Sequence, residues 1–400
     1  MFIQKTVIEM LNYNLEGLIM KNRKLVCIPG PTPVHRNIQN QMGRETVAFG
    51  DPIFVKDYKE LIEDLKEVFD CSGEVFPIAG TGTLAMEMAI ANNVKKGDNL
   101  LIVSHGYFGD RFIDLCQRKG INVDVLSCDW GKIVSVEEIE NKLKEKSYAA
   151  LTVTHVDTAT GVAAPIKEIG EMMKKFEDTL FIVDGVCATA AEEEYVDSMG
   201  IDVLLTGSQK AFGVSPGILV VFASKKSLER RKSMGTIPEF YVDYEKWIPI
   251  MQDPSKYFAT PAVNLVWAMQ ESVKMIKEEG IEERYKTHKK NAHAMQAAIE
   301  SLGFEILAEK DHRAVTLSNI LYMDGINDIE FRKILAEEGI VVAGGLGAYA
   351  GKMFRLGHMG NIDTHDMVST IATIERALYR VGKLSKFGQG VGTLLENLMK

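Results

Sequence analysis

The 400-residue chain lacks the sequence features of several broad protein classes. It has five cysteines, an odd number with no CxxC pair, and eight histidines without an HExxH spacing. These counts argue against a disulfide framework and against a transition-metal site. No apolar run reaches the length of a transmembrane helix. We therefore expect reduced thiols in a cytoplasmic protein that holds no metal and does not enter a membrane.

The charge and composition narrow the class of partner. The formal net charge is -9 and no basic block stands out, which argues against nucleic acid and against an anionic membrane surface. Small anionic substrates are compatible with this charge, because a local basic pocket can sit on an acidic protein. Hydrophobic residues make up 46% of a chain longer than one core usually covers, so we expect one large and one smaller domain.

The first twenty residues contain Glu9 and Glu16 among their apolar positions and form a poor signal peptide. Two interpretations stay open for this segment. It is either an amphipathic arm that packs on a partner subunit or an over-long start that precedes Met20. We assign residues 1–25 to an N-terminal extension.

Short β-rich runs alternate with helix-period segments from about residue 57 to residue 225. The expected strands are Val75–Ile78, Leu100–Ser104, Ala149–Thr154, Leu180–Val183, Val203–Thr206 and Ile218–Phe222. This alternation predicts an α/β fold with a mainly parallel sheet, covered by helices on both faces. Ligands of such sheets bind at the carboxyl ends of the strands.

From Pro261 onward the pattern changes to long helical stretches with a few short strands, and a final helix is expected near Thr364–Val381. This part predicts a smaller α+β domain. The expected organisation is thus a large domain over residues 26–260 and a small C-terminal domain over residues 261–400.

The most informative segment carries Lys210 in a polar turn after the strand Val203–Thr206. A lone lysine in such a place is usually a surface residue, but a buried one can condense with an aldehyde. Asp184 also follows an apolar strand, so it reaches the same edge of the sheet. The loop Gly80–Thr83 adds glycines and hydroxyls before a helical stretch, which is typical of an anion site at a helix N-terminus.

Taken together, these pieces resemble the class V aminotransferases of the fold-type I pyridoxal-phosphate superfamily, and within it the alanine–glyoxylate and serine–pyruvate aminotransferases. The resemblance covers nearly the whole chain after about residue 26. Its motifs are Pro29–Val34, Gly80–Thr83, His105–Gly109, Thr154–Gly161, Val183–Asp184, Gly207–Lys210 and Phe354–Gly360.

The resemblance implies pyridoxal 5'-phosphate as cofactor and a ping-pong transamination between small amino acids and 2-oxo acids. Lys210 would bind the cofactor covalently and shuttle the proton at the substrate α-carbon. Asp184 would pair with the pyridine nitrogen, and Arg355 would grip the substrate carboxylate as a bidentate fork. Alanine or serine is the expected amino donor, and glyoxylate or pyruvate the expected acceptor.

The resemblance also implies the residues that surround the cofactor. Phe108 would stack on its ring, and Thr158 would hydrogen-bond near its phenolic oxygen. Thr81 and Gly82, together with Gln209, would hold its phosphate, and Thr83 of the same loop would also bind the cofactor. Because sites of this family lie at the interface of a homodimer, Tyr257 and Thr260 would reach the phosphate bound by the partner subunit.

Three other enzyme activities are alternatives to this interpretation; a non-catalytic binding module is disfavoured because Lys210, Asp184 and Arg355 are all present. A desulfurase needs a cysteine in the second domain, and none follows Cys187. A 2-aminoethylphosphonate–pyruvate aminotransferase has similar motifs, but would need further positive groups that the sequence does not place. A nucleotide-dependent oxidoreductase is less favoured, because the glycine fingerprint after the first strand is missing.

Overall fold

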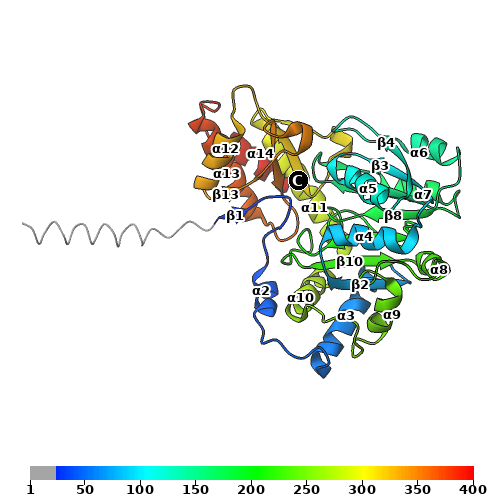
Figure 1. Ribbon diagram of the computed structural model, residues 1–400. Coiled ribbons are helices and arrows are strands. Elements are labelled where there is room, and N and C mark those ends of the chain that lie inside the picture. The colour runs from blue at the N-terminus through cyan, green and yellow to red at the C-terminus, as the bar shows by residue number, and fades with distance from the viewer. Residues whose placement is uncertain (1–23) are drawn as a thin grey trace, which may run out of the picture.

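The computed structural model describes residues 24–400, and its largest element is a seven-stranded sheet (Figure 1). The strands follow the order β2 (Glu74–Ala79), β10 (Ile218–Ala223), β9 (Val203–Gly207), β8 (Leu180–Asp184), β5 (Ala150–Thr154), β3 (Asn99–Ser104) and β4 (Asn122–Ser127). Five of them, from β9 to β4, run parallel, and β10 is antiparallel to both of its neighbours. The α/β class with a mainly parallel sheet is confirmed.

The central strands are fully buried, as their continuous apolar sequences predict. Every residue of β5, β8, β9 and β10 is buried, because helices cover the sheet. In Figure 1, α4 (Gly82–Asn93) and α3 (Pro52–Val68) lie on opposite sides of β2 and β10. The remaining helices of this part are α2 (Arg36–Met42), α5 (Tyr107–Arg118), α6 (Val136–Leu143), α7 (Ile166–Met173), α8 (Lys225–Ser233) and α9 (Tyr244–Gln252).

Strand β4 is absent from the predicted strands. It lies at the edge of the sheet and pairs only with β3. None of its six residues is fully buried. Its sequence, Asn-Val-Asp-Val-Leu-Ser, therefore carries polar side chains instead of the continuous apolar run that marks the central strands.

A second core forms around a four-stranded antiparallel sheet of the C-terminal part. Its order is β11 (Glu305–Ile306), β12 (Leu317–Leu321), β15 (Met353–Gly357) and β14 (Ala343–Gly344). The helices here are α11 (Ile281–Ser301), α12 (Asp328–Glu337), α13 (Thr364–Arg380) and α14 (Gln389–Leu398). The helix expected to be the last one is α13. That expectation was wrong, because α14 follows it. Its glycines at 388, 390 and 392 weaken the helical pattern in the sequence.

The division of the chain at residue 260 remains a prediction. Helix α10 (Val263–Glu279) buries Val266, Trp267 and Val273 in the core of the large sheet. The second core takes Cys27 from the start of the described chain and its other buried residues from Ala294 onward. At the other end of the chain, β1 (Leu25–Val26) pairs in parallel with β13 (Ile340–Val341). The N-terminal extension, apart from its last two residues, lies outside the described residues.

Two absences hold for residues 24–400. None of their helices has the length and apolar character needed to span a membrane. No group of three or more His, Cys, Asp or Glu side chains in this range is placed to hold a metal ion.

Helix α14 is anchored by a buried carboxylate from α13. Glu375 is 3% exposed and accepts hydrogen bonds from the backbone N–H groups of Gly388 (2.8 Å), Gly390 (2.7 Å) and Val391 (3.3 Å). The N-cap residue Gly388 offers no side-chain acceptor of its own. Glu375 therefore satisfies amide groups that the helix leaves unpaired at its start.

We predict that Glu375→Gln lowers the free energy of unfolding by about 1–3 kcal/mol, because its amide group would meet N–H donors in a buried place. The measurement is urea unfolding followed by circular dichroism. Glu283→Gln is the matched control, since Glu283 forms an exposed ion pair with Lys286. That control should change stability by less than about 0.5 kcal/mol. Equal losses in the two variants would contradict the anchoring role.

Candidate active site

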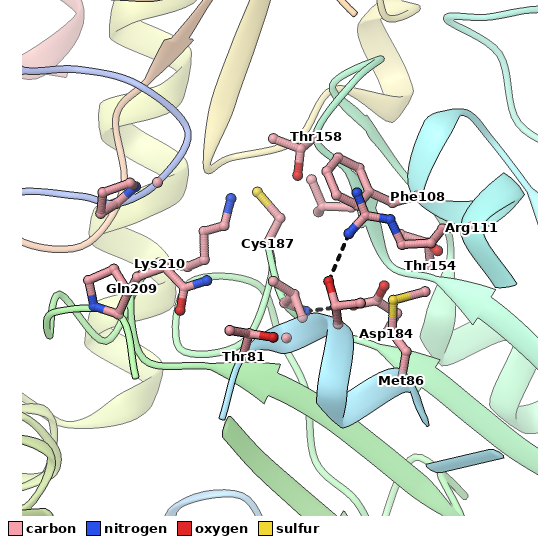
Figure 2. A pocket seen from close by; sticks show the side chains of 17 residues that line it. Thr81, Met86, Phe108, Arg111, Thr154, Thr158, Asp184, Cys187, Gln209 and Lys210 are labelled. Atoms are coloured by element: carbon pink, nitrogen blue, oxygen red, sulfur yellow. Dashed lines mark hydrogen bonds between the residues drawn. The ribbon is translucent and has the colours of Figure 1, made fainter. Parts of the chain in front are cut away.

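The carboxyl ends of four strands meet around one cavity of about 240 Å³ (Figure 2). Strands β2, β5, β8 and β9 run in the same direction, because β10 reverses the chain between β9 and β2. The loops that follow them therefore reach the same edge of the sheet. Eight predicted residues line the cavity: Thr81, Gly82, Thr83, Phe108, Thr158, Asp184, Gln209 and Lys210.

Asp184, the last residue of β8, is a buried carboxylate. Its side chain accepts a hydrogen bond from the Val186 N–H (2.9 Å) and forms no ion pair within residues 24–400. Burial raises the pKa of Asp184 to about 7; the nearby charges of Asp157 and Glu194 add to the rise, and the Val186 hydrogen bond and the charge of Lys210 oppose it. A cationic group in the cavity would offset this desolvation.

Lys210 lies in the turn after β9 and is 9% exposed. Its Nζ donates a hydrogen bond to the carbonyl oxygen of Pro29, in the segment that leads from β1 into α2. Gly30 has a φ of +110°, and a Cβ there would lie 2.5 Å from Cδ of Lys210. A glycine at position 30 therefore gives the lysine the room that it occupies.

The start of α4 forms a cradle for an anion. Thr81 is the N-cap residue, and its Oγ1 accepts from the N–H of Leu84 (3.3 Å). A Cβ on Gly82 would lie 2.9 Å from a methyl carbon of Val186, so the chain comes close to its neighbour here. The side-chain oxygen of Gln209 is buried and finds no hydrogen-bond partner in the described part of the chain. Helix N–H groups, hydroxyls and an amide thus converge on one place.

The opposite wall of the cavity carries Phe108 and Thr158. Phe108 is the second residue of α5, and Thr158 follows β6 (Val156–Asp157) in the turn before β7 (Val162–Ala163). Figure 2 shows both side chains near Arg111. An aromatic ring and a hydroxyl therefore stand on the side of the cavity away from Lys210.

Nine residues that line the cavity were not among the predicted site residues, and Arg111 and Cys187 are two of them. Arg111 donates from Nη1 to Oγ1 of Thr83 (2.9 Å), and its guanidinium lies 4.8 Å from the centre of the Phe108 ring. Arg111 lies three residues after Phe108 on the same helix, and this spacing could have indicated that the two side chains share one face. Cys187 also faces the cavity, three residues after Asp184. Its position just after the carboxyl end of β8, where ligands of parallel sheets bind, could have indicated this.

Three predicted residues do not line the cavity of this chain. Arg355 on β15 is partly buried, and its Nε donates to the carbonyl oxygen of Gly344 (2.8 Å). Burial lowers the pKa of this guanidinium. Tyr257 is 61% exposed, and its hydroxyl lies 3.4 Å from that of Thr260, which is also exposed.

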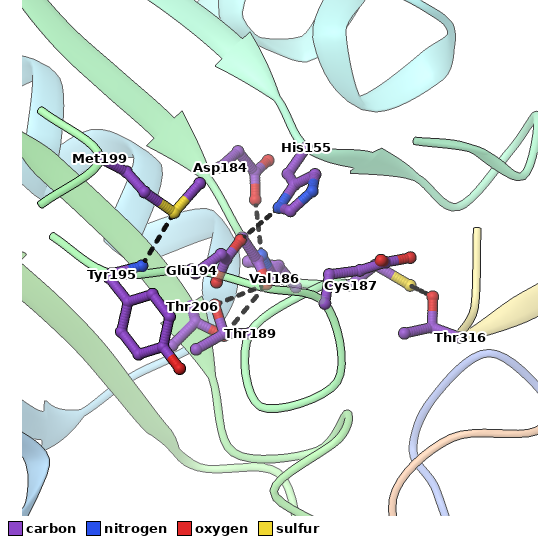
Figure 3. Close-up of polar contacts among 12 residues, drawn as sticks. His155, Asp184, Val186, Cys187, Thr189, Glu194, Tyr195, Met199, Thr206 and Thr316 are labelled. Atoms are coloured by element: carbon purple, nitrogen blue, oxygen red, sulfur yellow. Dashed lines mark hydrogen bonds and ion pairs between the residues drawn. The ribbon is translucent and has the colours of Figure 1, made fainter. Parts of the chain in front are cut away.

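Two buried histidines, His155 and His358, do not line the cavity. Nδ1 of His155 lies 2.7 Å from Oε1 of Glu194, and both side chains are buried beside Asp184 (Figure 3). Burial lowers the pKa of His155, but the hydrogen bond and charge of Glu194 outweigh that effect, so the pKa is raised. Nε2 of His358 lies 3.0 Å from the Ser318 hydroxyl.

Known proteins of similar sequence cover almost the whole chain. An uncharacterized aminotransferase of Methanocaldococcus jannaschii is 38% identical over 94% of this chain and 98% of its own length. The serine–glyoxylate aminotransferase of Arabidopsis thaliana is 30% identical over 92% of this chain and 94% of its own. Among solved structures, the alanine–glyoxylate aminotransferase of Nostoc sp. matches with a TM-score of 0.86 at 31% identity, over 90% of this chain and 97% of that one.

The resemblance inferred from the motifs is confirmed by these matches and by a family model. The model described as aminotransferase class-V matches residues 34–362. The fold-type I architecture expected from the sequence agrees with the Nostoc structure. The chain belongs to the class-V aminotransferase family.

Proposed function

We propose that this aminotransferase moves an amino group from a small L-amino acid, alanine or serine, to glyoxylate or pyruvate, with pyridoxal 5'-phosphate as cofactor. The observation that carries the proposal is the meeting of Lys210 and the buried, unpaired Asp184 in one cavity with an anion cradle. The similar proteins named for serine and for alanine both use glyoxylate in their names, which supports glyoxylate as acceptor.

The residues present fit the chemical groups of the cofactor. The α4 N-terminus, the Thr81 hydroxyl and the NH₂ group of Gln209 suit its phosphate, because each can donate a hydrogen bond to a phosphate oxygen. The buried carboxylate of Asp184 suits a protonated pyridine nitrogen. Phe108 offers a ring to stack on, and Thr158 a hydroxyl for the phenolic oxygen.

Each residue then has a definite task in the proposed reaction. When bound, pyridoxal phosphate stabilises the negative charge that forms at the α-carbon of the amino acid. Lys210 binds the cofactor and, once displaced by the amino donor, holds the proton taken from that α-carbon. Asp184 keeps a proton on the pyridine nitrogen through its negative charge. The transfer of the amino group to the acceptor reverses these steps.

Arg355 is proposed to bind the substrate carboxylate. Within residues 24–400 its guanidinium makes one hydrogen bond, from Nε to Gly344, and takes part in no ion pair. Its two Nη groups therefore keep the donors that a carboxylate accepts side by side. The carboxylate would bring the counter-charge that the partly buried guanidinium lacks.

We also propose a cytoplasmic homodimer that shares its active sites. The five cysteines are all unpaired, and four of them are buried, in keeping with a reducing compartment. Tyr257 and Thr260 project from an exposed surface beside the Phe49 ring, which lies 4.9 Å from that of Tyr257. In the proposed dimer this exposed surface meets the partner subunit.

The first experiment follows the visible absorption of the purified protein loaded with cofactor. Alanine or serine should bleach the band, and glyoxylate or pyruvate should restore it. A band that responds only to 2-aminoethylphosphonate would replace the proposed donor. No band after addition of pyridoxal phosphate would overturn the proposal.

Replacing the lysine separates its role from that of the cavity. Lys210→Ala should lower transamination by roughly three orders of magnitude or more. Borohydride reduction of the loaded wild type should attach the cofactor to the chain, as intact mass measures, and should attach none to the variant. Lys174→Ala, a surface replacement, is the control and should behave as wild type. If the cofactor became attached to Lys210→Ala as well, a lysine other than Lys210 would bind it, and the proposed role of Lys210 would be wrong.

Asp184→Asn should have opposite effects on stability and catalysis. The native pKa of about 7 exceeds the ordinary 3.8, so the native state binds more protons than the unfolded chain between these values, and this group makes stability fall as pH rises. The apoprotein variant should therefore gain melting temperature over wild type at pH 8 and gain less at pH 5. Activity should fall on the order of 100-fold, a loss typical of removing one electrostatic partner. An equal gain in melting temperature at pH 8 and pH 5 would contradict the claim that a buried negative charge on Asp184 destabilises the apoprotein.

Tyr257→Phe tests the shared site. Loss of one hydroxyl that reaches the partner's phosphate should weaken cofactor binding about tenfold, because hydrogen bonds to charged groups are the strong ones. Fluorescence titration with pyridoxal phosphate measures the affinity, and sedimentation measures the oligomer. A wild-type monomer with full activity would contradict the proposal.

A further inference from the structure

Asp157 is a fully buried carboxylate behind the wall of the cavity. It ends the short strand β6, its side chain is 0% exposed, and it forms no ion pair with any residue described by the structure. Burying such a group without hydrogen bonds would cost several kcal/mol, so its partners define what it does. Burial raises the pKa of Asp157, and hydrogen bonds from three backbone amides oppose that rise.

Two of these amides belong to the first turn of α5. Oδ2 of Asp157 accepts from the N–H of Phe108 (2.9 Å) and from that of Gly109 (3.3 Å). The residue before the helix, Gly106, provides no side-chain cap. Asp157 thus caps α5 from a distant part of the sequence, and its negative charge faces the positive end of the helix. The contact fixes the backbone that carries the Phe108 ring.

The third amide belongs to the turn that carries Thr158. Oδ1 of Asp157 accepts from the N–H of Ala159 (2.8 Å). The backbone oxygen of Asp157 accepts from the N–H groups of Thr160 (3.2 Å) and Gly161 (2.8 Å). Both the side chain and the backbone oxygen of Asp157 therefore hold the turn of residues 157–161 together. One carboxylate holds the backbone on which both cavity-wall groups stand.

Gly106 shows how closely this arrangement is packed. A Cβ at position 106 would lie 2.9 Å from Cγ of Asp157 and 2.8 Å from a methyl carbon of Thr160. Any side chain there would push the carboxylate away from α5. A glycine at this position is therefore a condition for the contact between Asp157 and the helix.

We propose that Asp157 is a positioning residue that sets the Phe108 ring and the Thr158 hydroxyl at fixed places against the cofactor. Its two oxygens divide the task, one serving α5 and the other serving the turn. This inference rests on the function proposed for the cavity, in which the ring stacks on the cofactor and the hydroxyl meets its phenolic oxygen.

The test replaces Asp157 by asparagine. An amide has one oxygen, so it can serve α5 or the turn, and its NH₂ group must face an N–H donor on the other side. We expect the dissociation constant for pyridoxal phosphate to rise about tenfold or more, a change of roughly 1.4 kcal/mol in binding. The visible circular dichroism of the bound cofactor should also change, because Phe108 and Thr158 would no longer hold the cofactor ring in one orientation.

Asp110→Asn is the matched control, since Asp110 lies in the same first turn of α5 but is exposed. Its Oδ1 accepts from the hydroxyl of Ser104 (2.7 Å), and an amide oxygen can accept the same bond. This variant makes the same change of charge at the same helix end. It should bind the cofactor with wild-type affinity and with the wild-type dichroism.

A double-mutant cycle shows whether Asp157 acts through the ring. Phe108→Leu removes the stacking partner, and the loss of affinity in the double variant should be smaller than the sum of the two single losses. Additive losses would overturn the proposal. So would an Asp157→Asn protein with wild-type affinity and dichroism.

Folding is checked on the apoproteins by far-ultraviolet circular dichroism and melting temperature. If Asp157→Asn does not accumulate as folded protein, Asp157→Ser takes its place in the same measurements. Failure of both variants to fold would overturn the proposal, because Asp157 would then serve the fold as a whole. A wild-type protein that binds no cofactor would instead overturn the proposed function, which separates the two failures.

Discussion

The parallel pairing of β5, β8 and β9 is the constraint on which the site depends. Thr154 on β5 pairs with Asp184 on β8, which pairs in turn with Leu205 on β9, five residues before Lys210. Backbone hydrogen bonds hold this register, and a slip by one residue would turn each side chain to the other face. The carboxylate and the lysine are thereby placed relative to each other by the sheet, before any ligand is present.

The second constraint is the path of the chain between the two cores. β1 pairs with β13, and the N–H of Gly357 donates to the carbonyl oxygen of Cys27 (2.8 Å) beside it. Because the chain is fixed to the second core at this point, the next residues, Pro29 and Gly30, lie against the side chain of Lys210. The strand that holds Arg355 is the same strand that ends at Gly357. The segment therefore links the proposed carboxylate-binding strand to the lysine, although the two belong to different sheets.

The fold and much of the cavity lining were predictable from the sequence because their signals are local. Continuous apolar runs mark buried parallel strands, and the residues after them must reach one edge of the sheet. Asp184 and Lys210 follow this rule. Strand β4 and helix α14 did not, since β4 is an exposed edge strand without a continuous apolar run and α14 begins among glycines that lower helix propensity. Arg111 and Cys187 needed the structure, because their side chains reach the cavity only through the packing of α5 and of the loop after β8.

The sequence by itself determined which residue types follow which strands, and thereby the family and the cavity in which a lysine and a carboxylate meet. Only the tertiary structure decided which distant backbone groups those residues hold. Asp157 caps a helix that begins 50 residues before it in the chain, at Tyr107. Such contacts join segments with no common periodicity. Each depends on the close approach of two backbones, which a pattern of side chains in one segment does not encode.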